Sequence, residues 1–268
     1  MSTNASLTQS EFAEGLRHVG VERSSVVLVH SAMRTFGHIV GGAGTAVEAL
    51  LETLGPSGTL VTPTFTFAHE AEADPVIDPK SDPSEMGAIS EATRRHLHSQ
   101  RSVAFRHSFA AIGRRAEVIT QTDPALSPFD LRSSFGVMLS LNTQILLFGM
   151  TYSSSTSHHF AEWVCDVPYR HTISMTLKVR GTDGSIIKQP MMDYQPKSEG
   201  GSYYGSRGPD FHRLGRMLEE RDLVGTTFIG NAAVRRYAMR DLIDLAQDEA
   251  ARDHNIFRTP EGQQEILT

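Results

Sequence analysis

Short apolar runs and amphipathic segments follow one another along most of this chain. The runs 24–30, 58–67 and 145–149 are short, rich in β-branched or aromatic residues and bounded by turn residues, so each predicts a buried strand. Between the first two, apolar residues from Val47 to Leu54 recur at spacings of three and four, which predicts a helix. The pattern is that of strands joined by helices.

The same criteria predict helices, strands and loops in the rest of the chain. Asp183 and Gly184 form a strong hairpin-turn signal between two apolar runs. No internal repeat and no linker interrupts the pattern, which predicts one domain over residues 1–268. The further elements expected are helices over 8–18, 86–98, 136–141, 211–220 and 231–248, strands over 103–112, 173–180, 185–190 and 223–229, loops over 68–85 and 195–208, and a weakly patterned tail from 252.

The segment 151–164 (TYSSSTSHHFAEWV) carries the most informative chemistry. Six of its eight residues from Tyr152 to His159 bear hydroxyl groups, which favours a turn and a helix N-cap after the strand 145–149. The following helix places His159 and Glu162 three apart on one face. An imidazole beside a carboxylate is a common arrangement for a general base. The alternative is a cap or surface histidine with Glu162 on a solvated face.

Composition narrows the classes of partner. The net charge of −6 argues against nucleic acid or an anionic membrane as partner, since both reward clustered Lys and Arg. No apolar window reaches the ~18 residues of a membrane span, and the N-terminus is too polar for a signal peptide, so we expect a cytoplasmic protein. Cys165 is the only cysteine, which excludes an intrachain disulfide and a thiolate metal cluster.

A second candidate region follows the first strand. His30 and Ser31 lie at its carboxyl end, where ligands bind in open α/β sheets. Gly41 and Gly42 then precede a helix and would allow a close approach of backbone to ligand. Their spacing fits neither a Walker loop nor a dinucleotide-binding fingerprint, and a plain tight turn is the alternative.

Six motifs in order resemble the aminoglycoside 3-N-acetyltransferase family, which transfers an acetyl group from acetyl-CoA to an amine. They are His30-Ser31 with Phe36-Gly37; Val40-Gly41-Gly42; Leu54-Gly55-Pro56 through Thr59-Leu60-Val61 to Pro63-Thr64; Met86-Gly87-Ala88-Ile89 with Glu91; His107-Ser108-Phe109-Ala110; and Thr156-Ser157-His158-His159 with Ala161-Glu162. The resemblance covers most of residues 1–165. It implies an α/β (α+β) single domain with a central mixed sheet flanked by helices.

The resemblance also implies roles for individual residues. The family's TS-x-H-x-x-E pattern puts the general base on His159, not His158, and its acidic partner on Glu162. Coenzyme A would lie along the loop after His30 and the segment around Ser108, with no metal needed. The residues so assigned to coenzyme A are His30, Ser31, Phe36, Val40, Gly41, Gly42, Thr64, His107, Ser108 and Phe109. For His30 and His107, a buried hydrogen-bonded histidine is the alternative role.

One departure from the family concerns the acceptor. Antibiotic-modifying members carry an acidic residue before TS-x-H, where this chain has Ser153-Ser154-Ser155. Since aminoglycosides are polycations that need carboxylates around them, this favours a less cationic acceptor near Ser153. Asp193 is a candidate for a second acidic group in the acceptor site.

Several functions compete at this point. An acetyl-CoA-dependent transferase would act on a small-molecule amine, in antibiotic resistance or in biosynthesis, as a monomer or homodimer. The chain's twelve histidines, with the pairs His96/His98 and His158/His159, prompt a metal-dependent hydrolase, although no H-E-x-x-H motif is present. A non-catalytic coenzyme A-binding relative and an acyl-enzyme on Cys165 complete the alternatives.

Overall fold

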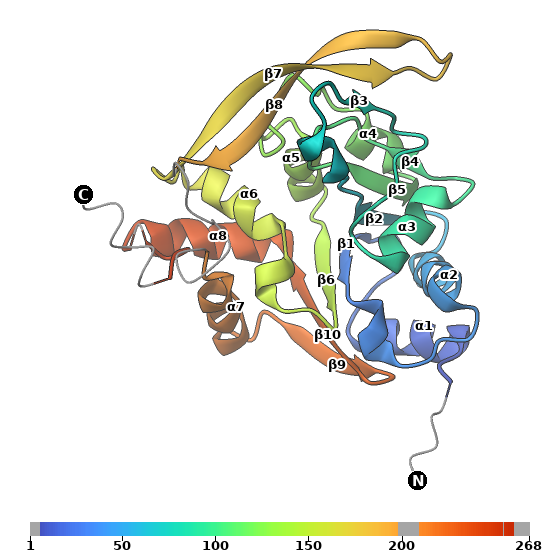
Figure 1. Cartoon of the computed structure of the whole chain (residues 1–268). Coiled ribbons are helices and arrows are strands. Elements are labelled where there is room, and N and C mark those ends of the chain that lie inside the picture. The colour runs from blue at the N-terminus through green and yellow to red at the C-terminus, as the bar shows by residue number, and fades with distance from the viewer. Residues whose placement is uncertain (1–5, 198–208, 254, 260–268) are drawn as a thin grey trace.

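The computed structural model describes residues 6–197, 209–253 and 255–259, and its main feature is a seven-stranded mixed sheet. Figure 1 shows this sheet running through the middle of the molecule. In spatial order its strands are β4 (Gln100–Arg101), β5 (Phe109–Gly113), β2 (Thr59–Pro63), β1 (Val26–Ser31), β6 (Gln144–Phe148), β10 (Ala232–Ala238) and β9 (Gly225–Ile229).

The strands β2, β1 and β6 form the parallel centre of the sheet. β1 pairs in parallel with β2 on one side and with β6 on the other. The outer pairs β2 with β5, β5 with β4, β6 with β10 and β10 with β9 are all antiparallel. The carboxyl ends of the central parallel strands therefore meet at one edge, where the loops after Ser31, Pro63 and Phe148 begin.

Helices cover both faces of the sheet because side chains along β1 alternate between two hydrophobic clusters. Val27 and Val29 belong to the cluster on one face, and Leu28 belongs to the cluster on the other. Buried residues of α1 (Gln9–His18), α2 (Gly42–Leu54) and α3 (Ala88–Arg95) join the first cluster. Those of α4 (Ala116–Thr120), α5 (Ser134–Ser140), α6 (Ser157–Val164), α7 (Phe211–Glu220) and α8 (Met239–Ala250) join the second.

A long hairpin forms most of a second sheet. Its strands β7 (Arg170–Arg180) and β8 (Ile186–Pro196) pair along their whole length, and β3 (Val76–Ile77) adds in parallel to β7. In Figure 1 the hairpin is an arched arm whose base lies beside α6. Gly184 has a φ of 83°, the left-handed conformation that the Asp183-Gly184 turn requires.

The expected fold class is confirmed, and so are most of its elements. The capping box opens α1, with Glu11 N donating to the Thr8 hydroxyl and Thr8 N to the Glu11 carboxylate. The hairpin lies where Asp183-Gly184 predicted it, with strands longer than expected. The loop predicted over 195–208 begins inside β8, and its residues 198–208 lie outside the described part of the chain.

The single helix predicted over 231–248 is wrong. Residues 232–238 form strand β10, and helix α8 begins only at Met239. Val234 and Tyr237 lie three positions apart, a spacing that fits one face of a helix and also a strand that is buried on both faces. The local pattern therefore does not distinguish helix from strand here. Pairing of β10 with β6, almost 90 positions earlier in the sequence, decides it instead.

Smaller differences concern element ends. The strand expected over 103–112 begins at Phe109, which leaves His107 and Ser108 in the preceding loop. The strand expected over 58–67 ends at Pro63, and the helix expected over 86–98 covers 88–95. The loop 68–85 contains β3 and a turn of 3₁₀ helix, Ala68–Ala71, and α4 was not predicted at all.

Candidate functional site

His159 and Glu162 meet on one face of α6, as their spacing predicted. The His159 Nδ1 lies 2.6 Å from the Glu162 Oε2. The Glu162 side chain is fully buried, and that of His159 is 13 % exposed. His158 points elsewhere: it is fully buried and its ring stacks on Phe211 at 4.9 Å. In this helix register, therefore, the side chain that contacts Glu162 is that of His159 and not that of His158.

Three donors converge on the Glu162 carboxylate. Besides His159, the Tyr169 hydroxyl donates to Oε1 at 2.9 Å and the Arg170 Nη1 donates to Oε2 at 2.9 Å. Arg170 also donates through Nη2 to the Tyr194 carbonyl, and its guanidinium lies 4.6 Å from the centre of the Tyr194 ring. The beginning of β7 and the end of β8 thus complete a site that α6 begins.

The charges around this pair keep the carboxylate ionised and the imidazole neutral. Burial alone would raise the pKa of Glu162, but the hydrogen bonds from His159 and Tyr169 and the charge of Arg170 leave that pKa below its usual range. Burial lowers the pKa of His159, and Arg170 lowers it further against the opposing effect of Glu162. A neutral imidazole that donates from Nδ1 to a carboxylate carries its lone pair on Nε2 and can accept a proton there.

Aromatic side chains enclose the imidazole. Phe211 of α7 meets it edge-on at 4.8 Å, and Phe129 lies 6.4 Å away on another side. Both phenylalanines are fully buried parts of the main core. The base candidate is thus held against rigid apolar walls.

His107 and Asp193 form a second polar group behind Phe129. The Nδ1 of His107 lies 3.7 Å from the Asp193 Oδ1, and the His107 ring lies 4.9 Å from that of Phe129. Burial lowers the pKa of His107 to about 3, so this histidine is neutral. Asp193 is 1 % exposed and faces Arg106 at 3.6 Å and the side-chain amide of Gln195 at 2.8 Å. Its role toward an acceptor stays a prediction, since its carboxylate is turned inward.

Ser108 and Thr64 are tied together by Arg101. The Ser108 hydroxyl donates to the Thr64 carbonyl at 2.9 Å. The guanidinium of Arg101 reaches the Thr64 and Thr66 hydroxyls and donates to the Asp82 carbonyl at 2.6 Å. Arg101 therefore fastens the end of β2 to the loop 68–85 and to the start of β5.

The remaining residues assigned to coenzyme A fall into three groups. Phe36 and Phe109 pack inside the two hydrophobic clusters, so only their backbone could face a ligand. Val40 is 49 % exposed, and Gly41 and Gly42, with φ of 78° and 68°, form a turn that demands glycine before α2. Burial lowers the pKa of His30 to about 4. Among the described residues, the buried His30 Nε2 and Ser31 Oγ have no hydrogen-bond partner.

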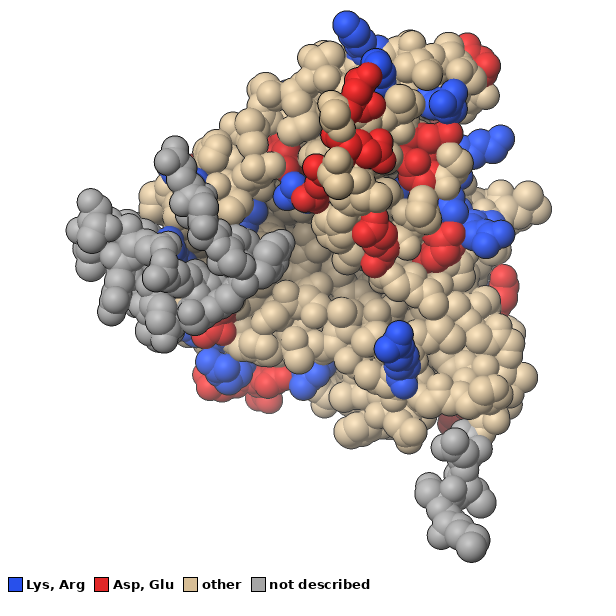
Figure 2. Space-filling view, viewed as in Figure 1, with Lys and Arg blue, Asp and Glu red and all other residues tan. Residues whose placement is uncertain are grey.

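Acidic residues concentrate in the loop 68–85. It contains Glu70, Glu72, Asp74, Asp78, Asp82 and Glu85 against one basic residue, Lys80, a net charge of −5 out of −6 for the chain. Figure 2 shows acidic side chains gathered on the face that it displays. The Arg106 guanidinium lies 3.0 Å from the Glu70 carboxylate and 3.6 Å from the Asp193 carboxylate. It therefore connects the loop 68–85 to the second polar group.

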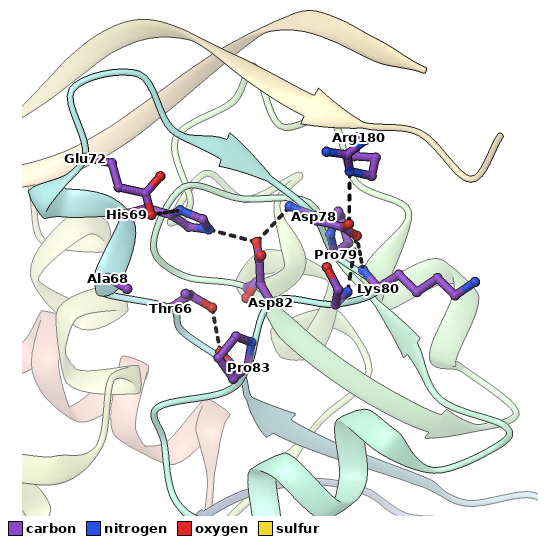
Figure 3. Close-up of polar contacts among 12 residues, drawn as sticks. Thr66, Ala68, His69, Glu72, Asp78, Pro79, Lys80, Asp82, Pro83 and Arg180 are labelled. Carbon is purple, nitrogen blue, oxygen red and sulfur yellow. Dashed lines mark hydrogen bonds and ion pairs between the residues drawn. The ribbon is translucent and has the colours of Figure 1, made fainter. Parts of the chain in front are cut away.

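Two of these carboxylates stabilise the loop itself, as Figure 3 shows. Asp82 accepts from the backbone N–H of Asp78 at 2.7 Å and lies 2.8 Å from the Nε2 of His69. Asp78 forms an ion pair with Arg180 of the hairpin at 3.2 Å. Glu70, Glu72, Asp74 and Glu85 lie exposed on this frame, where Glu70 forms an ion pair with Arg106 and Asp74 forms one with Lys178.

Sequence reasoning missed Tyr169, Arg170, Phe129 and Phe211. None of them lies within four positions of His159 or Glu162, so no local spacing pointed to them.

Ser153 lies exposed in a 3₁₀ turn, Tyr152–Ser154. Ser155, the residue after this turn, is buried with its hydroxyl 3.2 Å from that of Tyr237. Within residues 6–197, 209–253 and 255–259, no group of three or more His, Cys, Asp or Glu side chains is placed to hold a metal ion. No helix in this part of the chain is long and apolar enough to cross a membrane.

Comparison with known proteins gives one consistent answer. The family model for aminoglycoside 3-N-acetyltransferases matches residues 28–250. Aminoglycoside N(3)-acetyltransferase IV of a Salmonella species is 30 % identical over 258 residues, covering 95 % of this chain and 92 % of that protein. Aminoglycoside N(3)-acetyltransferase VII of Streptomyces paromomycinus is 26 % identical over 262 residues, covering 89 % and 90 %.

Solved structures agree with this result. The apoenzyme of aminoglycoside acetyltransferase AAC(3)-IVa superimposes with a TM-score of 0.76 at 28 % identity, covering 96 % of this chain and 93 % of that one. AAC-VIa bound to sisomicin gives 0.78 at 25 % identity, covering 92 % and 99 %. The chain belongs to the aminoglycoside 3-N-acetyltransferase family of acyl-CoA-dependent N-acetyltransferases.

Proposed function

We propose that this protein transfers an acetyl group from acetyl-CoA to an amine of an aminoglycoside or a related polycation, with His159 as general base. The observation that carries the proposal is the 2.6 Å contact between His159 and the buried carboxylate of Glu162. Glu162 fixes the ring and places the imidazole proton on Nδ1. The opposite nitrogen is then available for the proton of the attacking amine.

The reaction is a direct transfer within a ternary complex. His159 Nε2 accepts a proton from the acceptor nitrogen as that nitrogen attacks the thioester carbonyl of acetyl-CoA. The tetrahedral intermediate collapses with cleavage of the carbon–sulfur bond, which leaves an amide and coenzyme A as thiolate. Fixed donors around the carbonyl oxygen stabilise the charge that develops there.

The proposed binding region for coenzyme A is the edge of the sheet at the carboxyl end of β1. The partnerless polar atoms of His30 and Ser31 are buried there, and buried polar atoms without a partner suit a site that a ligand or water completes. The turn at Gly41 and Gly42 leads into the N-terminus of α2, where the backbone N–H groups of a first helical turn can bind an anion. A protein of the same fold has been solved as a complex, AAC-IIIb with CoASH, at a TM-score of 0.78.

The acceptor is proposed to be cationic despite the serines at 153–155. In place of an acidic residue at positions 153–155, the loop 68–85 supplies carboxylates, and four of these carboxylates are exposed. Carboxylates offset the charge of an amine-rich acceptor and raise its local concentration. The related AAC-VIa was solved with sisomicin bound.

The base is tested by release of coenzyme A thiol from acetyl-CoA with an amine acceptor. His159→Ala should lower kcat by about a hundred- to ten-thousand-fold, as expected for loss of a general base. Acetyl-CoA affinity, measured by calorimetry, should change little. His171→Ala, an exposed histidine outside the helix, is the matched control and should keep full activity. Full activity of His159→Ala would overturn the assignment.

The acceptor class is tested by neutralising the exposed loop. The pair Glu72→Gln and Asp74→Asn should raise KM for a multiply charged aminoglycoside and leave KM for a singly charged amine nearly unchanged. The effect should weaken as salt is added, because exposed charges are screened. Glu14→Gln, on the outer face of α1, is the control for a change of net charge alone. Equal KM changes for both acceptors would contradict a role of the loop in recognition.

A further inference from the structure

Arg170 lies between the two members of the proposed catalytic pair. Its Nη1 is 2.9 Å from the Glu162 Oε2 and 3.0 Å from the His159 Nδ1. We infer that Arg170 is a positioning residue that keeps His159 neutral with its proton on Nδ1, so that Nε2 stays ready to accept a proton. This inference rests on the proposed function of His159.

The contacts determine which atom carries the imidazole proton. Glu162 is ionised, and a carboxylate oxygen and an unprotonated ring nitrogen would repel each other at 2.6 Å. A proton therefore lies between them, on Nδ1. A guanidinium can only donate, so Arg170 Nη1 directs its hydrogen to Glu162 Oε2, and its approach to Nδ1 places two donors side by side.

That approach has an electrostatic consequence. If His159 became an imidazolium, a second positive charge would lie 3.0 Å from the guanidinium. Arg170 thus opposes protonation of His159 while it compensates the charge of Glu162. Without Arg170, the buried carboxylate would be balanced best by a protonated His159.

Within the part of the chain that the structure describes, the other groups placed around His159 do not supply this effect. On its own helix are Glu162 and the neutral, buried His158, and Tyr169, which donates its hydroxyl to Glu162, lies just before β7. The neutral His107 lies beyond Phe129, with Asp193 of β8 behind it and Arg106 next to Asp193. Phe129 and Phe211 are apolar. Arg170 is the cation in direct contact with the pair among the described residues.

The guanidinium is held firmly enough to act in this way. Its side chain is 5 % exposed, its Nη2 donates to the Tyr194 carbonyl at 2.9 Å, and its plane lies over the Tyr194 ring. Arg170 is also the first residue of β7 and pairs with Pro196 of β8. The hairpin base therefore fixes both the backbone and the charged group.

The direct test is an NMR titration of ring-labelled histidines in the full-length protein, with the His159 signal identified by its absence in His159→Ala. In Arg170→Gln the pKa of His159 should rise by about one to two units. Arg170→Lys restores the charge and should return the pKa most of the way. Tyr169→Phe removes an uncharged donor to Glu162 and should move it less. Unchanged values in Arg170→Gln would overturn the inference.

The pH profile of kcat/KM provides a second readout that a purely structural role would not give. In Arg170→Gln the acidic limb should shift upward by the same amount, with activity recovering at high pH. An equal loss at every pH would overturn the inference. A failure of the proposed function looks different: the pKa of His159 would still rise in Arg170→Gln, but His159→Ala would release thiol at the normal rate.

Discussion

Three buried histidines should make this protein lose stability in mild acid. Burial lowers the pKa of His30 to about 4 and those of His107 and His158 to about 3, against 6.5 in an exposed histidine. Each is neutral when folded and can be protonated only after unfolding. Their contribution is therefore fully present above pH 6.5 and is lost as the pH falls from 6.5 toward 4 and 3.

The size of the effect follows from the pKa difference. At pH 5 the unfolded chain gains about 2 kcal/mol per histidine, because each pH unit below 6.5 is worth about 1.4 kcal/mol. Three histidines together give about 6 kcal/mol, an appreciable part of the ~5–15 kcal/mol that stabilises a typical domain. The lowered pKa of Glu162 has the same sign, but it acts at lower pH, where carboxylates titrate.

Urea unfolding between pH 4 and 8 measures this directly. His158→Leu removes one of the three groups, so its free energy of unfolding should fall less steeply, by about 1.4 kcal/mol per pH unit between pH 6 and 4. His171→Leu makes the same chemical change at an exposed site and should keep the wild-type slope. A wild-type slope in His158→Leu, or a wild-type stability that is flat down to pH 5, would refute the reasoning.

Three further predictions concern other parts of the chain. Gly41→Ala should cost about 1–2 kcal/mol, because φ is 78° there and the new Cβ would clash with the Thr45 hydroxyl oxygen, whereas Gly44→Ala, in open space inside α2, should gain about 0.5–1 kcal/mol; urea unfolding of both checks the pair. Arg101→Met should cost about 3 kcal/mol in the same measurement, because the Asp82 carbonyl loses its donor and the Thr64 carbonyl keeps only that of Ser108, and Arg101→Lys should recover part of it. Cys165→Ser should leave the rate of thiol release unchanged, because burial raises the pKa of this thiol to about 11 and keeps it protonated; a large loss would favour an acyl-enzyme.

The pairing of His159 with Glu162 was predictable because it depends on local geometry. Residues three apart on a helix face one another whatever the rest of the chain does. The same holds for the Thr8 capping box and the Asp183-Gly184 turn, which are fixed by a few neighbouring residues. The strand runs of the central sheet were recognisable because both faces are buried, which makes the runs continuously apolar.

What could not be predicted depends on contacts between distant segments. Arg170 reaches Glu162 only because the hairpin base packs beside α6, and nothing in its own neighbourhood signals this. Whether residues 232–238 form helix or strand is decided by β6, which the local pattern does not contain. Phe36 and Phe109 carry motif signals but pack in the core, because a motif records a position in the chain and not the direction of a side chain.

The position of β6 has a consequence for how the protein is made. This strand lies between β1, which begins at residue 26, and β10, which begins at residue 232. β6 therefore waits for its second neighbour until residues 232–238 have been synthesised, about four seconds or more after β6 itself at ~5–20 residues per second. During that interval one edge of β6, whose residues 145–148 are apolar, has no neighbouring strand. Chaperone dependence and slow refolding are the expected costs of such non-local pairing.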